Sequence, residues 1–277
     1  MEKKIGESIK NGLVGVLKGT QDVAVGIVDA VSATTVKVLE SVKDIETSLG
    51  AIIGGAIKVA GDAGADLTMV AKNSIVGVLK GVHEIGSVTI DVIRDTAHGA
   101  VKGTADIGGD ITSVAKGAIV GAISGTRDIA VSAEDAASAA ARGIIRAVFE
   151  VEGDAVGATK SAVKGAVGGV AEASNQLTTV IKDTSKGLVL GASEVGGDAV
   201  SVAKNAVLGT IEVAKDLGLS AEKAASAAAI GAVEAAETIG GETGKAIKKV
   251  VTGTISGIKV VVKEPFRKKN NLRRVKK

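Results

Sequence analysis

The chain has 277 residues, a formal net charge of +3 and 45% hydrophobic residues, yet it contains only two Phe and no Trp, Tyr or Cys. Globular cores are normally built on Leu, Ile and aromatic side chains that each bury a large area. The composition therefore excludes an ordinary aromatic-rich core and indicates that small side chains are buried over a great length.

The N-terminal segment does not have the pattern of a secretory signal. Lysines follow Met1, but Glu7, Lys10 and Asn11 interrupt the stretch that would have to be apolar. Further along, charged residues recur so often that no run approaches the roughly 18 apolar residues of a membrane-spanning helix. The absence of cysteine fits a cytoplasmic protein.

From about residue 20 to about residue 255, the sequence keeps an unbroken period of eleven residues. Glycine recurs every 22 residues from Gly55 to Gly253, and an acidic residue recurs every 44 residues from Asp22 to Glu242. Eleven residues complete three helical turns at about 3.67 residues per turn, so each repeat position forms one stripe along a helix. The glycines predicted to let helix backbones pack closely are Gly77, Gly99, Gly121, Gly143, Gly165, Gly187 and Gly209.

The other repeat positions separate an apolar face from a charged face. Residues one, four, five and eight positions after each multiple of eleven are almost all apolar. A mainly basic column follows at position six, as at Lys72 and Lys116, and a mainly acidic column at position seven, as at Glu150 and Glu194. The apolar residues predicted to face lipid or a partner chain are Leu67, Val70, Ile107, Ile111, Val114, Ile119, Ile123, Leu177, Ile181 and Ile211.

These patterns predict an all-α protein whose repeat region spans residues 1–262. Period-two alternation is absent, which argues against β-structure despite the abundant Val, Ile and Thr. Long, nearly uninterrupted amphipathic helices, extended or packed in an assembly, explain the continuous period best. The alternative is a stack of 44-residue helical hairpins, in which Gly108-Gly109-Asp110 and Gly196-Gly197-Asp198 would each end one helix and cap the next.

An isolated helix of this composition is not expected to be stable in water. Each of the 38 glycines weakens a helix by about 0.8 to 1 kcal/mol relative to alanine, whereas a surface ion pair returns only about 0.2 to 0.5 kcal/mol. Something must therefore cover the apolar face. The candidates are a lipid surface, further copies of the chain, or the chain's own folded-back segments.

A basic tail, residues 263–277, follows the repeat region around the single proline, Pro265. It carries eight basic residues and one acidic residue, and so a net charge of +7. It is predicted either to be solvated or to bind an anionic surface; nucleic acid binding is not expected outside this tail. The residues concerned are Arg267, Lys268, Lys269, Arg273, Arg274, Lys276 and Lys277.

No motif predicts catalysis, a cofactor or a metal site. His83 and His98 are the only histidines, and a zinc site needs three or four converging ligands. The Ser-x-x-Lys pattern at Ser113 recurs 88 residues later at Ser201, as expected of a structural repeat. The segment Gly240–Lys245 has spacing similar to a phosphate loop, but Ala246 replaces the Ser or Thr that would bind a metal.

Two segments carry a resemblance to a known class. Val70–Gly77 and Val114–Gly121 combine Val, Ala and Gly with isolated Lys, and this pattern resembles the eleven-residue repeats of perilipin-like and synuclein-like lipid-surface proteins. The similarity covers roughly residues 12–260. It implies a chain that becomes helical when it lies in a lipid interface.

The sequence thus predicts a non-enzymatic protein that coats or scaffolds a lipid or membrane surface through a long amphipathic helix. We expect a cytoplasmic location, peripheral to a membrane or lipid body, and a homo-oligomer. The alternative is a structural protein that assembles into filaments, sheets or tubes by lateral helix packing. In that case the glycine stripe and the opposed charged columns would set the register between copies.

Overall fold

The computed structural model describes residues 23–40, 45–86, 89–170 and 176–262, and most of these residues are helical. Each helix is 10 to 19 residues long. The elements are α2 (Val23–Leu39), α3 (Ile45–Asp62), α4 (Leu67–Glu84), α5 (Ile90–Asp106), α6 (Ile111–Gly125), a 3-10 turn η1 (Thr126–Asp128), α7 (Ala133–Glu150), α8 (Ala155–Val170), α9 (Leu177–Glu194), α10 (Ala199–Asp216), α11 (Ala221–Ile239), α12 (Gly241–Val250), β1 (Gly253–Ile255) and β2 (Ile258–Val260).

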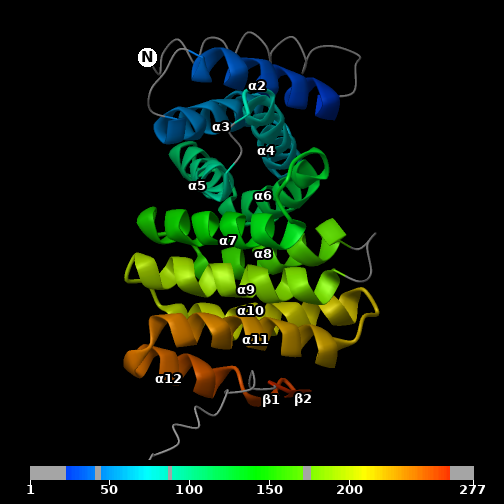
Figure 1. Cartoon of the computed structure of the whole chain (residues 1–277), viewed down its shortest axis with the longest axis vertical. Coiled ribbons are helices and arrows are strands. Elements are labelled where there is room, and N and C mark those ends of the chain that lie inside the picture. The colour runs from blue at the N-terminus through cyan, green and yellow to red at the C-terminus, as the bar shows by residue number, and fades with distance from the viewer. Residues whose placement is uncertain (1–22, 41–44, 87–88, 171–175, 263–277) are drawn as a thin grey trace, which may run out of the picture.

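The helices form two stacked layers. From α2 to α9, each helix packs mainly against the helices two places before and after it, and less extensively against its immediate neighbours; at the C-terminal end, α10 packs about equally against α8 and α11, and α12 packs more against α11 than against α10. One layer, here called the odd layer, contains α3, α5, α7, α9 and α11; the other, the even layer, contains α2, α4, α6, α8, α10 and α12. In the lower half of Figure 1, α7, α9 and α11 lie in front, and α8 and α10 lie behind them. The architecture is a solenoid of helical hairpins.

Side-chain caps explain why helices begin at a spacing close to 22 residues. Asp66 and Asp110 each accept hydrogen bonds from two backbone N–H groups, of α4 and α6, and Asp198 accepts one from the Ser201 N–H of α10. Ser132 and Ser220 cap α7 and α11 of the odd layer. The acidic residues 44 positions apart therefore mark the starts of even-layer helices, because aspartate and serine are preferred N-caps.

Glycines in the left-handed region end many of the helices. Gly108 and Gly196 have φ of +64° and +71°, and their N–H groups donate to carbonyls of the preceding helical turn. The expected long, uninterrupted helix is therefore wrong for the described residues, and the hairpin arrangement is found. The period survives the turns because each turn, like each helix, has nearly constant length, so multiples of eleven alternate between helix starts and helix centres.

The chain's own helices cover the apolar face. The core consists mainly of Ala, Val and Ile side chains contributed by both layers, with Ile52, Ile75, Ile93 and Ile144 among its largest fully buried members. Of the three candidates for covering the apolar stripe, folded-back segments therefore account for it in this structure. Burial of these apolar side chains is the main source of stabilisation for a helix rich in glycine.

The helical repeat ends before residue 262. After Val250, strands β1 and β2 pair in an antiparallel hairpin, with Ile255 opposite Ile258. Ser256 and Gly257 both have positive φ, which is typical of a two-residue hairpin turn. The β-branched residues around this turn favour strands, so the expectation of helix throughout the region is wrong here. The hairpin places Val260 against the end of the core.

Candidate interaction surface

Only a narrow stripe of each helix faces outward, because both flanks pack within its layer and the inner side packs against the other layer. In α6, the partly exposed positions of the central turns are Lys116, Val120 and Ser124, spaced four residues apart. The equivalent stripe of α4 contains Lys72, Val76 and Lys80. Functional side chains must therefore be sought along two outward surfaces, one for each layer.

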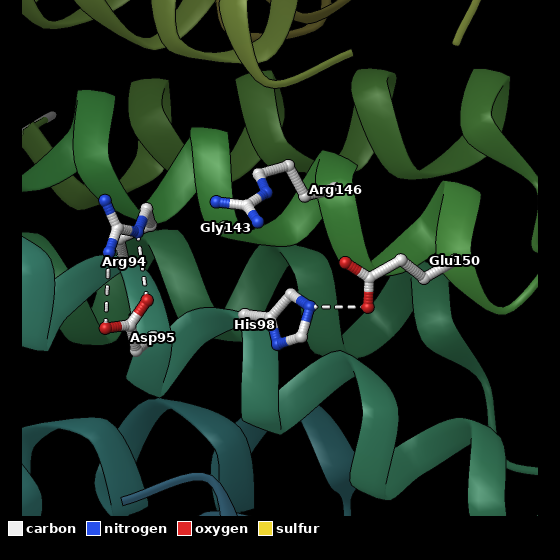
Figure 2. Close-up of a pocket in the computed structure, with 6 residues that line it drawn as sticks. All are labelled: Arg94, Asp95, His98, Gly143, Arg146 and Glu150. Atoms are coloured by element: carbon white, nitrogen blue, oxygen red, sulfur yellow. Dashed lines mark hydrogen bonds and ion pairs between the residues drawn. The ribbon is translucent and has the colours of Figure 1, made fainter. Parts of the chain in front are cut away.

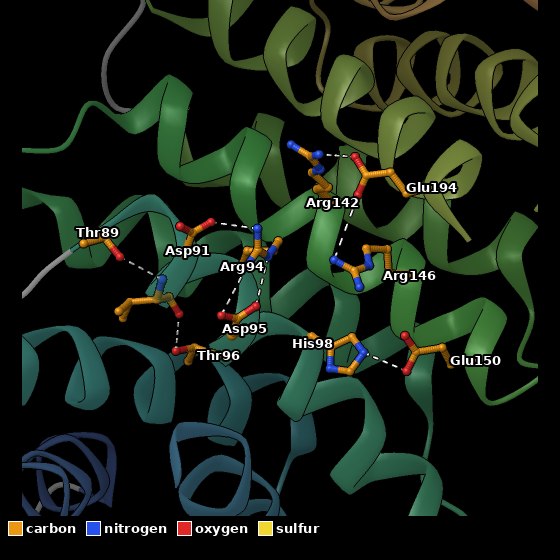
Figure 3. A network of polar contacts seen from close by, with 11 residues as sticks. Thr89, Asp91, Arg94, Asp95, Thr96, His98, Arg142, Arg146, Glu150 and Glu194 are labelled. Carbon is orange, nitrogen blue, oxygen red and sulfur yellow. Dashed lines mark hydrogen bonds and ion pairs between the residues drawn. The ribbon is translucent and has the colours of Figure 1, made fainter. Parts of the chain in front are cut away.

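The odd layer carries a ladder of ion pairs across neighbouring helices (Figure 3). Glu150 of α7 lies 2.9 Å from His98 Nε2 and 3.6 Å from Lys102 Nζ of α5. Each acidic residue in the ladder thus faces two bases, one turn apart, on the preceding helix of the layer. Two further sets repeat this geometry: Glu194 with Arg142 and Arg146, and Glu234 with Lys182 and Lys186.

A small hollow lies in this surface between α5 and α7 (Figure 2). Its volume is about 100 Å³, and its lining residues are Arg94, Asp95, His98, Gly143, Arg146 and Glu150. Arg94 is bound to Asp95, with Nε 2.9 Å from the carboxylate, and to Asp91 at 2.7 Å. Arg94 and His98 are therefore matched with carboxylates of the same surface, whereas the buried Arg146 Nε has no hydrogen-bond partner among the described residues. None of the residues that line the hollow is Ser, Thr, Cys or Lys, and its size suits a few water molecules.

The ladder shifts the pKa of several of its groups. Partial burial acts to raise the pKa of Glu150, but the His98 hydrogen bond and the nearby cations outweigh it and lower the pKa. Burial raises the pKa of Asp183 despite the adjacent Lys182. The pKa of Lys182 is raised, since attraction to Asp183 and Glu234 outweighs the opposing effect of burial. The Glu150 carboxylate and the Lys182 ammonium are therefore charged at neutral pH, and each lies next to a group of opposite charge.

The even layer has a different outward surface, here called the lysine face. Each of α4, α6, α8 and α10 presents one lysine from the same position, followed one turn later by Val76, Val120, Lys164 or Leu208. Among the described residues, Lys72, Lys116, Lys164 and Lys204 form no ion pair; Lys160 pairs with Glu212 at 2.8 Å. The lysine face consists of Lys72, Val76, Lys116, Val120, Lys160, Lys164, Lys204 and Leu208.

The total charge of the two layers also differs. The even-layer helices carry 11 lysines and 5 carboxylates, a net of +6, whereas the odd-layer helices carry 8 bases and 13 carboxylates, a net of −5. The aspartate caps of the even layer add negative charge where its helices begin, away from the outward stripe. Positive charge without an internal counterion therefore concentrates on the lysine face.

The apolar residues predicted to face lipid or a partner chain are located in or against the core. Val70, Val114, Ile119 and Ile181 are fully buried, and Ile123 and Ile211 are 6% and 2% exposed. The remaining four pack against the core while partly exposed: Leu67, Ile107, Ile111 and Leu177. In the folded solenoid these side chains face one another, so they do not form an outer apolar stripe.

The glycines predicted to permit close packing lie near helix centres, against the backbone of the preceding helix in the same layer. A Cβ placed on Gly99 would lie 2.6 Å from Gly50 Cα, closer than real Cβ atoms approach a neighbour. The same relationship holds for Gly77, Gly121, Gly143, Gly165 and Gly187; a Cβ on Gly209 would be less crowded, 3.0 Å from Lys160 Cγ and 3.1 Å from Lys160 Cα. Their neighbours are segments of the same chain and not other copies.

Several features of the outward surfaces were not anticipated from sequence. The basic and acidic columns were recognised, but their pairing within the chain was not: Glu150 and Glu194 each meet bases 48 and 52 positions earlier. The lysine face was also not anticipated, although the 44-residue spacing of Lys72, Lys116, Lys160 and Lys204 indicates that these lysines occupy equivalent positions. The basic-tail residues, Arg267 to Lys277, lie outside the described residues.

Among the described residues, no helix combines the length and the apolar character needed to cross a lipid bilayer. The same part of the chain contains no group of three or more His, Cys, Asp or Glu side chains that could hold a metal ion.

Comparisons with known proteins give little further information. No protein-family model matches the chain, and no curated protein matches it. Among solved structures, the crystal structure of a de novo designed helical repeat protein aligns with 71% of this chain and 97% of its own, at 13% identity and a TM-score of 0.29. The contacts between this chain's own helices define the solenoid.

Proposed function

We propose that this protein is a non-enzymatic scaffold that coats a lipid or membrane surface while it remains folded as a solenoid. The contact surface is the lysine face of the even layer. The observation that carries the proposal is the contrast between the two outward surfaces. The odd-layer helices supply counterions for six of their eight bases, whereas Lys72, Lys116, Lys164 and Lys204 have none within the described residues.

The composition of the lysine face supports a lipid interface. Val76, Val120 and Leu208 are partly exposed one turn from the lysine row, and Val156, at the start of α8, is 42% exposed. Surface-bound helices combine an apolar strip with lysines whose stems lie along apolar surface while their ammonium groups reach the headgroups. The lysine face presents this combination across four neighbouring helices.

The folded solenoid changes the mechanism expected for lipid contact. A long helix lying in the interface would need Val70, Val114 and Ile181 to leave the core, where they are fully buried. Binding through the lysine face leaves the core intact. The self-assembling alternative has less support, because the glycines and charged columns that would join copies are used between helices of one chain.

Distance measurement on lipid vesicles tests the proposal. Asp62 and Asp106 are exposed, lie 44 residues apart, and end the neighbouring helices α3 and α5. The chain has no cysteine, so Asp62→Cys/Asp106→Cys provides two unique sites for spin labels. In the solenoid these positions belong to adjacent helices with axes about 8–10 Å apart, whereas in one continuous helix they would be about 66 Å apart.

The proposal predicts that the double variant floats with vesicles and that the short label distance is the same with and without lipid. If the distance between the labels lengthens several-fold on vesicles, the chain binds lipid as an opened helix and not through the lysine face of the folded solenoid. Failure to bind vesicles of any composition would contradict the lipid-surface function itself.

A further inference from the structure

We infer that the lysine face recognises the anionic headgroups of phospholipids, with Lys72, Lys116, Lys164 and Lys204 as the contacting groups. This inference rests on the proposed function and specifies its partner. A cation that lacks an internal counterion gains most from an external anion, and an anionic bilayer presents such charges in a plane. The inference assigns selectivity to a folded surface and not to the basic tail alone.

The packing of the even layer determines the direction and spacing of the lysine row. A Cβ on Gly121 would lie 2.6 Å from the Lys72 carbonyl oxygen, and a Cβ on Gly165 would lie 2.6 Å from that of Lys116. Neighbouring helices therefore touch at the lysine positions themselves. Successive lysines start from backbones separated by one close helix spacing, about 8 Å, which places the row across the helices and parallel to the layer.

The acidic residues of the even layer neutralise little of the positive charge of this row. Asp29 pairs with Lys80 at 3.1 Å and Glu212 pairs with Lys160 at 2.8 Å. The other carboxylates of these helices, Glu84, Asp216 and Glu242, lie at helix ends. The centres of α4, α6 and α8 therefore carry lysines without a carboxylate on the same stripe.

A second copy of the chain is a weaker fit to the lysine row. The odd layer has a net negative charge, but the acids at its centre, Glu150, Glu194 and Glu234, are already paired with its own bases. Docking the lysine face there would require these pairs to exchange. An anionic bilayer offers phosphates and carboxylates without internal partners, and each lysine near such a surface strengthens binding about fivefold at moderate salt.

The test uses the full chain, so that the basic tail contributes equally to every variant. The lysine-face variant is Lys72→Gln, Lys116→Gln, Lys164→Gln and Lys204→Gln, which removes four charges but keeps most of each side-chain stem. Its charge-matched control is Lys58→Gln, Lys102→Gln, Lys186→Gln and Lys223→Gln on the odd-layer helices. A third variant replaces Lys72, Lys116, Lys164 and Lys204 by arginine and so keeps the charge.

Affinity is measured by flotation on phosphatidylcholine vesicles with and without phosphatidylserine, after circular dichroism has shown that each variant is folded. We expect the glutamine variant of the lysine face to lose roughly 600-fold in affinity for the anionic vesicles, which is about fivefold for each of the four lysines removed. The odd-layer control should change less than threefold, and the arginine variant should bind like the parent. Binding should weaken steeply as salt is added.

Equal losses in the two glutamine variants would show that net charge alone acts, and would overturn the inference. Equal binding of the parent to neutral and anionic vesicles would also overturn it while leaving the lipid-surface function in place. The absence of binding to either kind of vesicle would contradict both the inference and the lipid-surface function. A misfolded glutamine variant leaves the parent's lipid selectivity, its salt dependence and the arginine variant as independent tests.

Discussion

Gly121 lies against the backbone of Lys72, which is 49 positions earlier in the chain. Gly165 has the same relationship to Lys116, and Gly209 lies beneath the stem of Lys160, where an added Cβ would be 3.0 Å from Lys160 Cγ. In α6, α8 and α10, the central glycine of each helix therefore lies against a lysine of the row on the preceding even-layer helix. The glycine lets the helices approach, and the lysine at that crossing extends outward.

Replacing Gly121 by alanine should destabilise the protein by roughly 1–2 kcal/mol, because an overpacked contact outweighs the improved helix propensity. Gly168, exposed in α8 with no atom near its missing Cβ, provides the control. Gly168→Ala should be stabilising by up to about 1 kcal/mol. Denaturant unfolding of both variants measures the difference, and a stabilising Gly121→Ala would contradict the close contact.

Glu152 and Gly196 occupy equivalent turn positions, 44 residues apart, with φ of +53° and +71°. The next residue in each turn, Gly153 or Gly197, donates a 2.8 Å hydrogen bond to the preceding helix. A left-handed conformation disfavours a residue with a Cβ by about 1–2 kcal/mol. Glu152→Gly should therefore be stabilising by about 1 kcal/mol, and Gly196→Glu should be destabilising by a similar amount. Thermal unfolding should therefore show a higher melting temperature for Glu152→Gly and a lower one for Gly196→Glu. Changes of the same sign would show that the two turns are not equivalent.

Much of this fold could be predicted from the sequence, but the sequence did not decide between one continuous helix and a series of hairpins. The helical class, the Gly-Gly-Asp boundaries near Asp110 and Asp198, and the periodic apolar positions follow from local rules. Whether Ile181 faces lipid or another helix does not, because burial depends on how the chain turns back. An eleven-residue period is shared by one straight helix and by hairpins whose helix and turn total 22 residues.

The charged surfaces were predictable only in part, for a related reason. Glu150 and Lys102 stand in recognisable columns, but their pairing depends on which helices become neighbours. The same columns mix residues of both layers, and whether Lys116 has a counterion depends on the layer to which its helix belongs. Side-chain chemistry was visible in the sequence, whereas the identity of each neighbour was not.

The cap at Asp110 should make stability depend on pH in the acidic range. Hydrogen bonds from the Ser113 and Thr112 side chains hold the pKa of Asp110 below its ordinary value of 3.8. A carboxylate with a lowered folded-state pKa stabilises the protein above its unfolded pKa, and this contribution is lost as pH falls through the folded value. Asp110→Ala should lose about 1 kcal/mol at neutral pH. The variant should lose less stability than the parent on acidification from pH 5 to pH 2; identical acid profiles would contradict the assignment.

The ion pairs of Glu194 should stabilise the folded protein modestly, and this stabilisation should depend on salt. Glu194→Gln removes the partner of Arg142 and Arg146 and should be destabilising by about 1 kcal/mol, because these partly exposed pairs are screened by solvent. Glu84 also ends an 18-residue helix, α4, and forms no ion pair within the described residues. Glu84→Gln is therefore the matched control and should change stability by less than about 0.5 kcal/mol. Added salt should reduce the difference between the variants; a difference that grew with salt would argue against the ion pairs.

The central claim is that the chain covers its own apolar face and needs no lipid or second copy to fold. Circular dichroism of the dilute protein in lipid-free buffer, with its mass measured by light scattering in the same sample, tests this most directly. The account predicts a strongly helical monomer that unfolds cooperatively. Low helicity that rises only when vesicles are added, or helicity found only in large assemblies, would contradict it.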